Sequence, residues 1–192
     1  MATTNAGKLG EIRDALAGVP IELVALADLS RLPEPEETGA TFADNAKLKA
    51  LYYGDRHGLP TLAEDSGLVI DALDGEPGVR SARFLGADTG YPERFEEIER
   101  RLALYPEAPR TARFVCAAVI VADRQVAFEA TGVVEGIIVS APAGSNGFGY
   151  DPIFFFPPYN ATFGEVSKEA KLRVSHRGNA FRQVAAWLRS PM

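Results

Sequence analysis

Two apolar runs rich in β-branched residues, 112–121 and 125–139, are separated only by Ala122-Asp123-Arg124. Runs this close together are typical of a long β-hairpin. Apolar residues with helical spacing occur at 8–16, 41–53, 93–104 and 177–188, and shorter extended patterns occur at 21–26, 62–70 and 153–156. Helices that alternate with strands around a hairpin predict an α/β fold of three layers, with a mixed sheet and flanking helices.

The composition limits the class of protein. The chain has 192 residues, enough for one domain whose core needs no disulfide or metal to hold it. With 20 Lys and Arg against 26 Asp and Glu, the net charge is −6, so no global positive field exists that would hold duplex nucleic acid. A small anion could bind only in a local basic pocket.

The distribution of apolar residues indicates the compartment. No stretch has the length of a membrane span, and residues 1–5 lack the apolar segment of a signal peptide. The one cysteine, Cys116, stands in an apolar run and is interpreted as core packing. We therefore expect a cytoplasmic protein with no nucleic-acid and no membrane partner.

A small polar loop, Thr3 to Lys8, leads directly into the first predicted helix. Backbone N–H groups and the positive end of the helix dipole attract anions at such a place, and Lys8 adds a full charge. These residues predict a phosphate site, although a simple helix cap would explain them too.

Carboxylates occur at two points where a metal could bind. Glu37 precedes the second predicted helix, and Glu64-Asp65 interrupts the apolar strand 62–70. Mg²⁺ takes one or two carboxylates together with substrate oxygens. A solvated turn would explain Glu37, but a charge inside an apolar strand costs stability without a partner, so Asp65 points to function.

Two further segments offer contacts for a nucleotide. Residues 146–152 combine glycines, which allow close approach of the backbone, with Phe148, whose ring can pack on a base; a packed glycine-rich turn is the alternative. Residues 168–177 place several cations at the start of the final predicted helix, where they oppose the helix dipole unless an anion compensates. Cations, carboxylates and an aromatic ring together describe a site for a nucleoside triphosphate.

Six segments carry a resemblance to a known family. They are Thr4-Asn5-x-x-Lys8, Glu37-Thr38-Gly39-x-Thr41-Phe42-x-x-Asn45-Ala46-x-x-Lys49-Ala50, Glu64-Asp65-Ser66-Gly67-Leu68, Pro77-Gly78-Val79-x-Ser81-Ala82-Arg83, Gly147-Phe148-Gly149-Tyr150-Asp151-Pro152 and Ser175-His176-Arg177. These segments are similar to the motifs of the inosine/xanthosine triphosphate pyrophosphatases, which cleanse the nucleotide pool. The resemblance covers nearly the whole chain.

The resemblance implies an activity and a site. Members hydrolyse non-canonical purine nucleoside triphosphates (ITP, dITP, XTP) to the monophosphate and pyrophosphate with Mg²⁺, usually as homodimers. The implied fold is an elongated mixed sheet in one domain, 1–192, with two lobes around a central cleft. Asp65 is implied as the catalytic residue, either the general base that prepares the water or a metal ligand, and Glu37 and Asp65 as the metal ligands. The implied substrate-binding residues are Thr3, Thr4, Asn5, Lys8, Lys49, Ser66, Phe148, Gly149, Tyr150, Asp151, Lys171, His176 and Arg177.

The chain departs from the family pattern in two places. Members commonly have Asp where this chain has Glu64, so no metal role is assigned to Glu64. Members also begin with a short apolar strand, whereas only Met1 precedes Ala2 here, so we expect that strand to be shortened or the start to be incomplete.

Two other functions compete with this one. A Maf-like nucleotide pyrophosphatase would act on other bases, but the segments around Phe148 and His176 argue against it. A nucleotide-binding sensor without catalysis would need base and phosphate contacts. It would not need Glu37 and a water-activating acid such as Asp65.

Overall fold

The structure is a computed structural model that describes residues 1–190, and the chain divides into two compact units. Unit 1 comprises Met1–Ser66, Cys116–Val133 and the described residues from Ser175 onward. Unit 2 comprises Gly67–Val115 and Val134–Val174. Among the described residues, no helix combines the length and the apolar character needed to cross a membrane.

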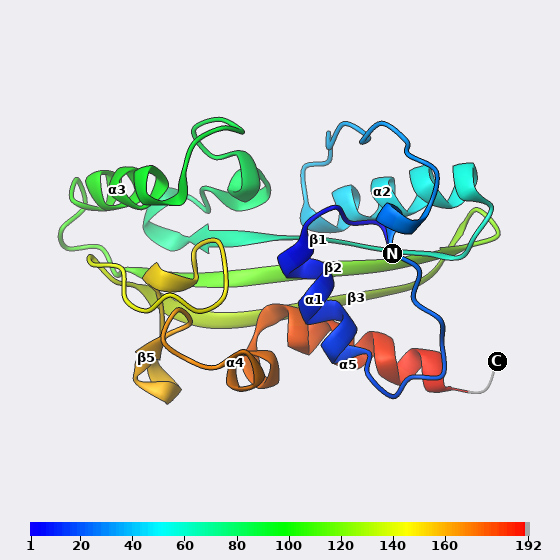
Figure 1. Ribbon diagram of the computed structural model, residues 1–192. Coiled ribbons are helices and arrows are strands. Elements are labelled where there is room, and N and C mark those ends of the chain that lie inside the picture. Colours follow the sequence, from blue (N-terminus) through cyan, green and yellow to red (C-terminus); the bar gives the residue numbers. More distant parts are fainter. Residues whose placement is uncertain (191–192) are drawn as a thin grey trace. The chain divides into compact units, whose positions relative to one another are not determined.

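Five strands form one sheet in the order β1-β2-β3-β4-β5 (Figure 1). They are β1 (Thr61–Ile70), β2 (Thr111–Ala122), β3 (Gln125–Ile138), β4 (Phe154–Phe156) and β5 (Ala161–Thr162). The α/β class and the long β2–β3 hairpin are confirmed. The sheet is antiparallel rather than mixed: β3 pairs antiparallel with β4, and β4 with β5. Its helices lie beside the sheet and do not connect parallel neighbours.

Five α-helices flank these strands: α1 (Ala6–Ala15), α2 (Phe42–His57), α3 (Tyr91–Leu102), α4 (Lys168–Val174) and α5 (His176–Arg189). Short 3₁₀ turns occupy Leu26–Asp28, Asp71–Leu73, Gly78–Arg83, Asp151–Ile153 and Pro157–Tyr159. The start of α2 follows the sequence prediction, because Thr41 accepts from the Asp44 N–H while Asp44 accepts from the Thr41 N–H.

One predicted strand and the predicted placement of one cationic segment are wrong. Residues 21–26 form no strand; they run as extended chain into a 3₁₀ turn, and the Met1 ammonium donates to Val24 O at 2.7 Å. The cations of 168–173 do not begin the final helix. They lie on the separate helix α4, which ends at Val174. Ser175 then caps α5 by accepting from the Gly178 N–H.

The strands of unit 1 are covered on both faces. Alternate residues such as Leu62, Cys116 and Ile120 pack with α1 and α5, while their neighbours Ala63 and Val119 pack with α2. Figure 1 shows α2 and α5 on opposite sides of these strands. Unit 1 therefore has the three layers predicted from sequence, and successive strand residues pack against different helices.

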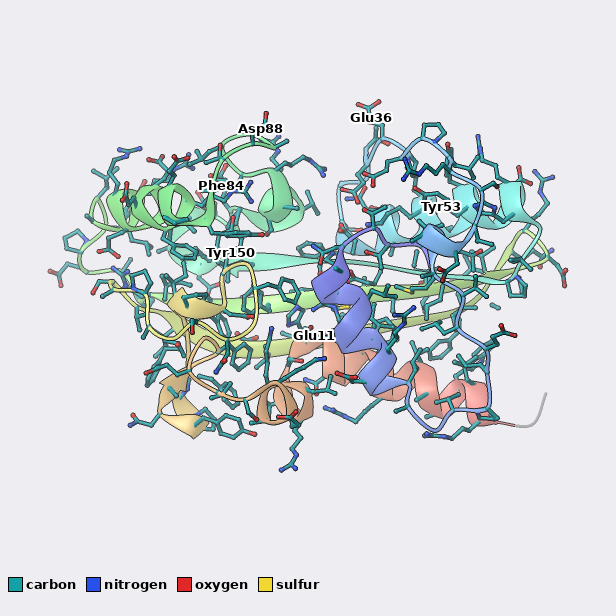
Figure 2. All side chains as sticks on the ribbon, viewed as in Figure 1. Glu11, Glu36, Tyr53, Phe84, Asp88 and Tyr150 are labelled. Atoms are coloured by element: carbon teal, nitrogen blue, oxygen red, sulfur yellow. The ribbon has the colours of Figure 1, made fainter. Side chains whose placement is uncertain are left out.

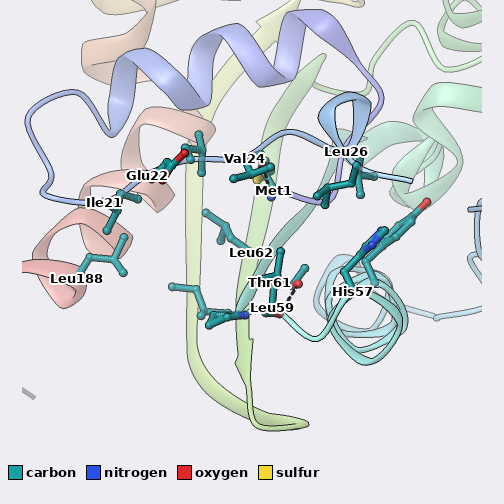
Figure 3. A pocket seen from close by; sticks show the side chains of 15 residues that line it. Met1, Ile21, Glu22, Val24, Leu26, His57, Leu59, Thr61, Leu62 and Leu188 are labelled. Carbon is teal, nitrogen blue, oxygen red and sulfur yellow. Dashed lines mark hydrogen bonds between the residues drawn. The ribbon is translucent and has the colours of Figure 1, made fainter. Parts of the chain in front are cut away.

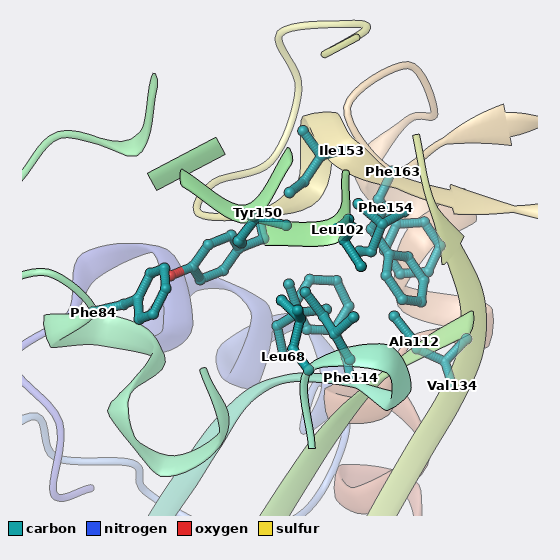
Figure 4. Close-up of a cluster of buried hydrophobic side chains, with 14 residues drawn as sticks. Leu68, Phe84, Leu102, Ala112, Phe114, Val134, Tyr150, Ile153, Phe154 and Phe163 are labelled. Carbon is teal, nitrogen blue, oxygen red and sulfur yellow. The ribbon is translucent and has the colours of Figure 1, made fainter. Parts of the chain in front are cut away.

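Unit 2 has a core in which aromatic rings pack among aliphatic side chains (Figure 4). Phe114, Phe154 and Phe163 pack together with ring centroids 4.5–6.3 Å apart. Tyr150 is buried in the same core and donates a hydrogen bond to Ser81 O at 2.9 Å. Burial raises the pKa of Tyr150, so its hydroxyl stays protonated.

Candidate functional site

The loop before α1 is a helix cap as well as a polar loop. Figure 2 draws the side chains on the ribbon and labels Glu11, which lies on α1. Asn5 caps α1 and accepts from the Lys8 N–H at 3.0 Å, and Thr3 accepts from the Asn5 N–H at 3.2 Å. Thr4 donates to Glu34 at 2.8 Å. The side chain of Lys8 runs back to β1, where its ammonium lies 2.7 Å from Glu64.

The two acids of β1 face opposite sides because consecutive strand residues alternate. Glu64 has the orientation of Leu62 and contacts side chains of α1 and α5. Asp65 has the orientation of Ala63 and contacts side chains of α2. Glu64 and Asp65, although adjacent in sequence, thus belong to two separate polar clusters on opposite sides of β1.

The cluster on the α2 side joins both predicted metal ligands. The Lys49 ammonium lies 2.6 Å from Glu37 Oε1 and 3.4 Å from Asp65 Oδ1. Asn45 Nδ2 donates to the other Asp65 oxygen at 3.2 Å. Both oxygens of Asp65 are therefore held by residues one helical turn apart on α2.

Burial and neighbouring charges shift the pKa values of this cluster in opposite directions. Burial raises the pKa of Asp65, although the positive charges of Lys49 and Lys8 oppose the shift. Burial alone would lower the pKa of Lys49, but the carboxylates of Asp65, Glu64 and Glu37 outweigh it, so the net shift is upward. The cluster thus holds a charged lysine next to a carboxylate whose ionisation is made costly, a feature typical of functional sites.

The cluster on the α1 and α5 side is centred on Arg177, which is 1% exposed. Its guanidinium donates to Glu11 at 2.5 Å, to Ser66 at 2.8 Å and to Glu64 at 3.5 Å. Burial by itself would raise the pKa of Glu64, but Lys8 and Arg177 outweigh it and keep the pKa well below its usual range. Glu64 is therefore an ionised anchor for two cations.

Cys116 belongs to the same buried cluster, with its Sγ 3.4 Å from Glu64 Oε2. Burial raises the pKa of this thiol well above its ordinary value, and the nearby Glu64 charge adds to the shift. The predicted packing role of Cys116 is confirmed.

The predicted base-binding segment lies in unit 2. Lys171 pairs with Asp151 at 2.6 Å, and its ammonium lies 4.8 Å from the centre of the Phe148 ring. Asp151 also accepts from the Phe148 N–H at 2.8 Å. Gly147 has φ +71° and a side chain there would meet the Asp151 carboxylate at 2.1 Å, so this turn requires glycine.

Nine of the predicted site residues fall into three groups. The α2 side of β1 holds Glu37, Lys49 and Asp65, and the other side of β1 holds Lys8, Ser66 and Arg177. Buried His176 is the first residue of α5. Phe148, Asp151 and Lys171 form the group in unit 2, whereas the side chain of Tyr150 is part of the core.

Sequence reasoning assigned no role to two polar residues that belong to these clusters, Asn45 and Glu11. Both are buried, and both bond to residues of the candidate site. Two signals in the sequence could have found them: Asn45 belongs to one of the segments that carry the resemblance and stands one helical turn before Lys49, and Glu11 stands three residues after Lys8.

Within residues 1–190, the predicted metal ligands are a pair of carboxylates, Glu37 and Asp65. Among residues 1–190, no group of three or more His, Cys, Asp or Glu side chains is arranged to hold an ion. Glu37 and Asp65 share the Lys49 ammonium, so they already accommodate one cation between them. Two carboxylates completed by substrate oxygens fit the ligand set that Mg²⁺ takes in phosphate chemistry.

A pocket of about 270 Å³ also lies within unit 1 (Figure 3). It is lined mainly by apolar side chains such as Met1, Val24 and Leu62, with Tyr53 and His57 stacked at its edge. None of the predicted site residues that the structure describes lines it. Since a triphosphate is strongly anionic, this apolar pocket is not a candidate for the substrate.

Comparisons with known proteins agree along nearly the whole chain. The dITP/XTP pyrophosphatase of Halalkalibacterium halodurans is 40% identical over 188 residues, which cover 98% of this chain and 97% of that protein. The protein of the same name from Geobacter sulfurreducens is 44% identical and covers 94% of this chain and 90% of its own.

Solved structures show the same relationship. A HAM1 protein from Coxiella burnetii superposes with a TM-score of 0.91 at 37% identity, covering 97% of this chain and 95% of that one. The Ham1 protein of Staphylococcus aureus gives a TM-score of 0.87 at 34% identity over 97% and 95%. The sequence profile of the Ham1 family matches residues 1–187, and the chain therefore belongs to the Ham1 family.

Proposed function

We propose that the protein hydrolyses non-canonical purine nucleoside triphosphates, such as dITP, XTP and ITP, to the monophosphate and pyrophosphate. Relatives that match nearly the whole chain are named dITP/XTP pyrophosphatases. The observation that carries the proposal is the α2 cluster, in which Lys49 joins Glu37 and Asp65. The residue proposed to bind phosphate and the two proposed to bind the metal lie next to one another, which supports the proposal.

The phosphates are assigned to the cations and N–H groups of unit 1. A nucleoside triphosphate brings about four negative charges, which repel an attacking hydroxide and need cations in the transition state. Lys8 and Lys49 supply two, and the loop from Thr3 to Asn5 adds hydroxyl and backbone donors at the start of α1. Both lysines are ion-paired to carboxylates, so binding the substrate exchanges these partners for phosphate oxygens.

Glu37 and Asp65 are the residues that would hold Mg²⁺. The bound ion would neutralise phosphate charge and stabilise the leaving pyrophosphate. Asp65 is also assigned the role of orienting the water, or taking its proton, for attack at the α-phosphorus. Its two oxygens are held by different partners, Lys49 and Asn45, so the carboxylate has a defined orientation for that role.

On the basis of the family resemblance, base contacts are proposed for His176 and Arg177 in unit 1 and for Lys171 and the turn from Phe148 to Asp151 in unit 2. Hypoxanthine and xanthine carry a carbonyl at position 6, which accepts hydrogen bonds, whereas adenine carries an amino group there. Arg177 can only donate hydrogen bonds. In a pocket of such donors, the N–H groups would find no acceptor at the 6-amino group of adenine. Ser66, which Arg177 holds, would contact the substrate beside Asp65.

Arg177→Lys tests this assignment of the base, because lysine keeps the charge and loses the planar fork of donors. We expect kcat/KM for ITP to fall at least about tenfold and the value for ATP to fall much less, since one lost charged hydrogen bond is worth roughly 1.5–3 kcal/mol. Steady-state kinetics on both nucleotides measures the ratio. An equal proportional loss on ITP and ATP would move base recognition to other residues.

Lys8→Ala and Lys49→Ala test the phosphate contacts. Each should weaken binding of ITP roughly tenfold to a hundredfold while binding of inosine changes little, because hydrogen bonds between charged groups are worth about 1.5–3 kcal/mol. Calorimetry with Ca²⁺ in place of Mg²⁺ measures binding without turnover. Lys47→Ala removes an exposed charge from the same helix as Lys49 and serves as the control. Unchanged ITP affinity in both variants would refute the assignment.

The proposed activity is tested by one panel of incubations with Mg²⁺. ITP, dITP and XTP should give pyrophosphate and the monophosphate, with ATP and GTP reacting far more slowly. A Maf-like preference for other bases would reverse that order, and a sensor would bind without turnover. We further propose a cytoplasmic homodimer on the basis of the family resemblance, and light scattering in solution measures the assembly.

A further inference from the structure

Asn45 is a fully buried amide at the centre of the α2 cluster. Its Nδ2 donates to Asp65 Oδ2 at 3.2 Å, and its Oδ1 accepts from the backbone N–H of Gly39 at 2.8 Å. The donor and acceptor ends of the amide thus face partners of opposite kind, which fixes its orientation. One side chain connects β1 to the loop that carries Glu37.

The contact with the loop depends on a glycine. A Cβ atom at Gly39 would lie 2.7 Å from Asn45 Oδ1 and 2.9 Å from the Asn45 backbone nitrogen. Contacts that short force a shift of the loop or the helix, so only glycine allows this approach. Gly39, two residues after Glu37, therefore packs directly against Asn45.

Asn45 and Lys49 hold the same two segments in different ways. Lys49 bonds to Glu37 and Asp65 through its charge, and the proposed function requires this ammonium to move to phosphate oxygens when substrate and metal arrive. Asn45 is neutral, so the incoming phosphate charge attracts it far less than it attracts the Lys49 ammonium. It can keep the two carboxylate-bearing segments in register while Lys49 changes partners.

We propose that Asn45 is a positioning residue, which acts through Asp65 and Gly39 to keep the Asp65 and Glu37 carboxylates in the arrangement that binds the metal and orients the water. The inference rests on the proposed function for the role of these two acids. Partners that orient metal ligands in this way typically affect metal affinity or activity by about 10–100-fold when they are removed.

The test compares two variants of Asn45. Asn45→Ala removes both bonds, and Asn45→Ser keeps a small polar group that cannot span both partners. Mn²⁺ affinity without nucleotide, measured by electron paramagnetic resonance, and kcat for ITP at saturating Mg²⁺ should each fall about 10–100-fold in both variants. Folded Asn45 variants with wild-type Mn²⁺ affinity and kcat would overturn the proposal.

Thr41→Ala is the matched control, because it weakens the same helix without touching Asp65. Loss of an N-cap costs about 1 kcal/mol of stability, and Thr41 caps α2. This variant should melt earlier and keep the Mn²⁺ affinity and kcat of the wild type. If it loses as much as Asn45→Ala, the effect belongs to helix stability and the proposal fails.

A measurement on the unmodified protein completes the test. The side-chain amide protons of Asn45 should be protected from hydrogen exchange both without and with Mg²⁺, and exchange at the rate of an exposed amide would overturn the proposal. The Mn²⁺ affinities decide the role of Asn45 without turnover. A wild-type protein that releases no pyrophosphate from ITP would instead refute the proposed function.

Discussion

Asp65→Asn is expected to reduce turnover of ITP by about 10²–10⁴-fold, the range typical of losing a general base. The substitution keeps the shape of the side chain and removes the charge that would bind the metal or take the proton. Because burial raises the pKa of Asp65, its charge costs folding energy, and the neutral amide should leave the melting temperature unchanged or slightly higher. Kinetics and thermal unfolding of the same sample measure both effects.

Asp55→Asn provides the comparison for this variant. Asp55 is an exposed acid on α2 that pairs with Arg124, so the same change of charge occurs away from the candidate site. It should retain wild-type turnover. Retention of more than about a tenth of the activity by Asp65→Asn would reject Asp65 as the central acid.

Arg177→Ala is expected to lower the free energy of unfolding by about 3–5 kcal/mol, because it leaves buried carboxylates without their cation. Glu11 and Glu64 both face the Arg177 guanidinium, and all three side chains are buried. In a domain of this size each kcal/mol shifts the melting temperature by roughly 2–4 °C, which gives a fall of roughly 6–20 °C. Calorimetry measures it directly.

A double variant separates loss of the ion pair from loss of packing. Glu11→Gln combined with Arg177→Met removes the charges of both partners and keeps most of the buried volume. It should be destabilised by less than the sum of the two single variants, since the second change removes a charge that the first left unpaired. Strict additivity would show that Glu11 and Arg177 do not depend on each other.

Several parts of the fold were predictable because they depend on local chemistry. The start of α2 followed from Thr41 and Asp44, whose side chains satisfy each other's backbone N–H groups. The β2–β3 hairpin followed from two long apolar runs separated by three residues. Ser175, in contrast, was not predicted as the cap that divides α4 from α5, because a serine between cationic stretches gives no periodic signal.

The sequence predicted many of the residues in these clusters, but not which residues contact one another. Sequence indicated that Lys8, Lys49 and Asp65 carry chemistry, but not that Glu64 and Asp65 serve different helices. That division depends on which face of β1 meets which layer, which only the packed sheet decides. Glu11 and Asn45 were missed because their partners are distant in sequence. Only their burial in the folded chain shows that these polar side chains need a partner.

Hydrolysis of ITP in ¹⁸O-labelled water tests most directly whether water attacks the α-phosphorus. With Mg²⁺ and the wild-type protein, the proposed mechanism places the ¹⁸O atom in the phosphate of IMP, and pyrophosphate leaves without label. Mass spectrometry of the two products reads the position. Label in the pyrophosphate, or formation of IDP with orthophosphate, would contradict attack at the α-phosphorus.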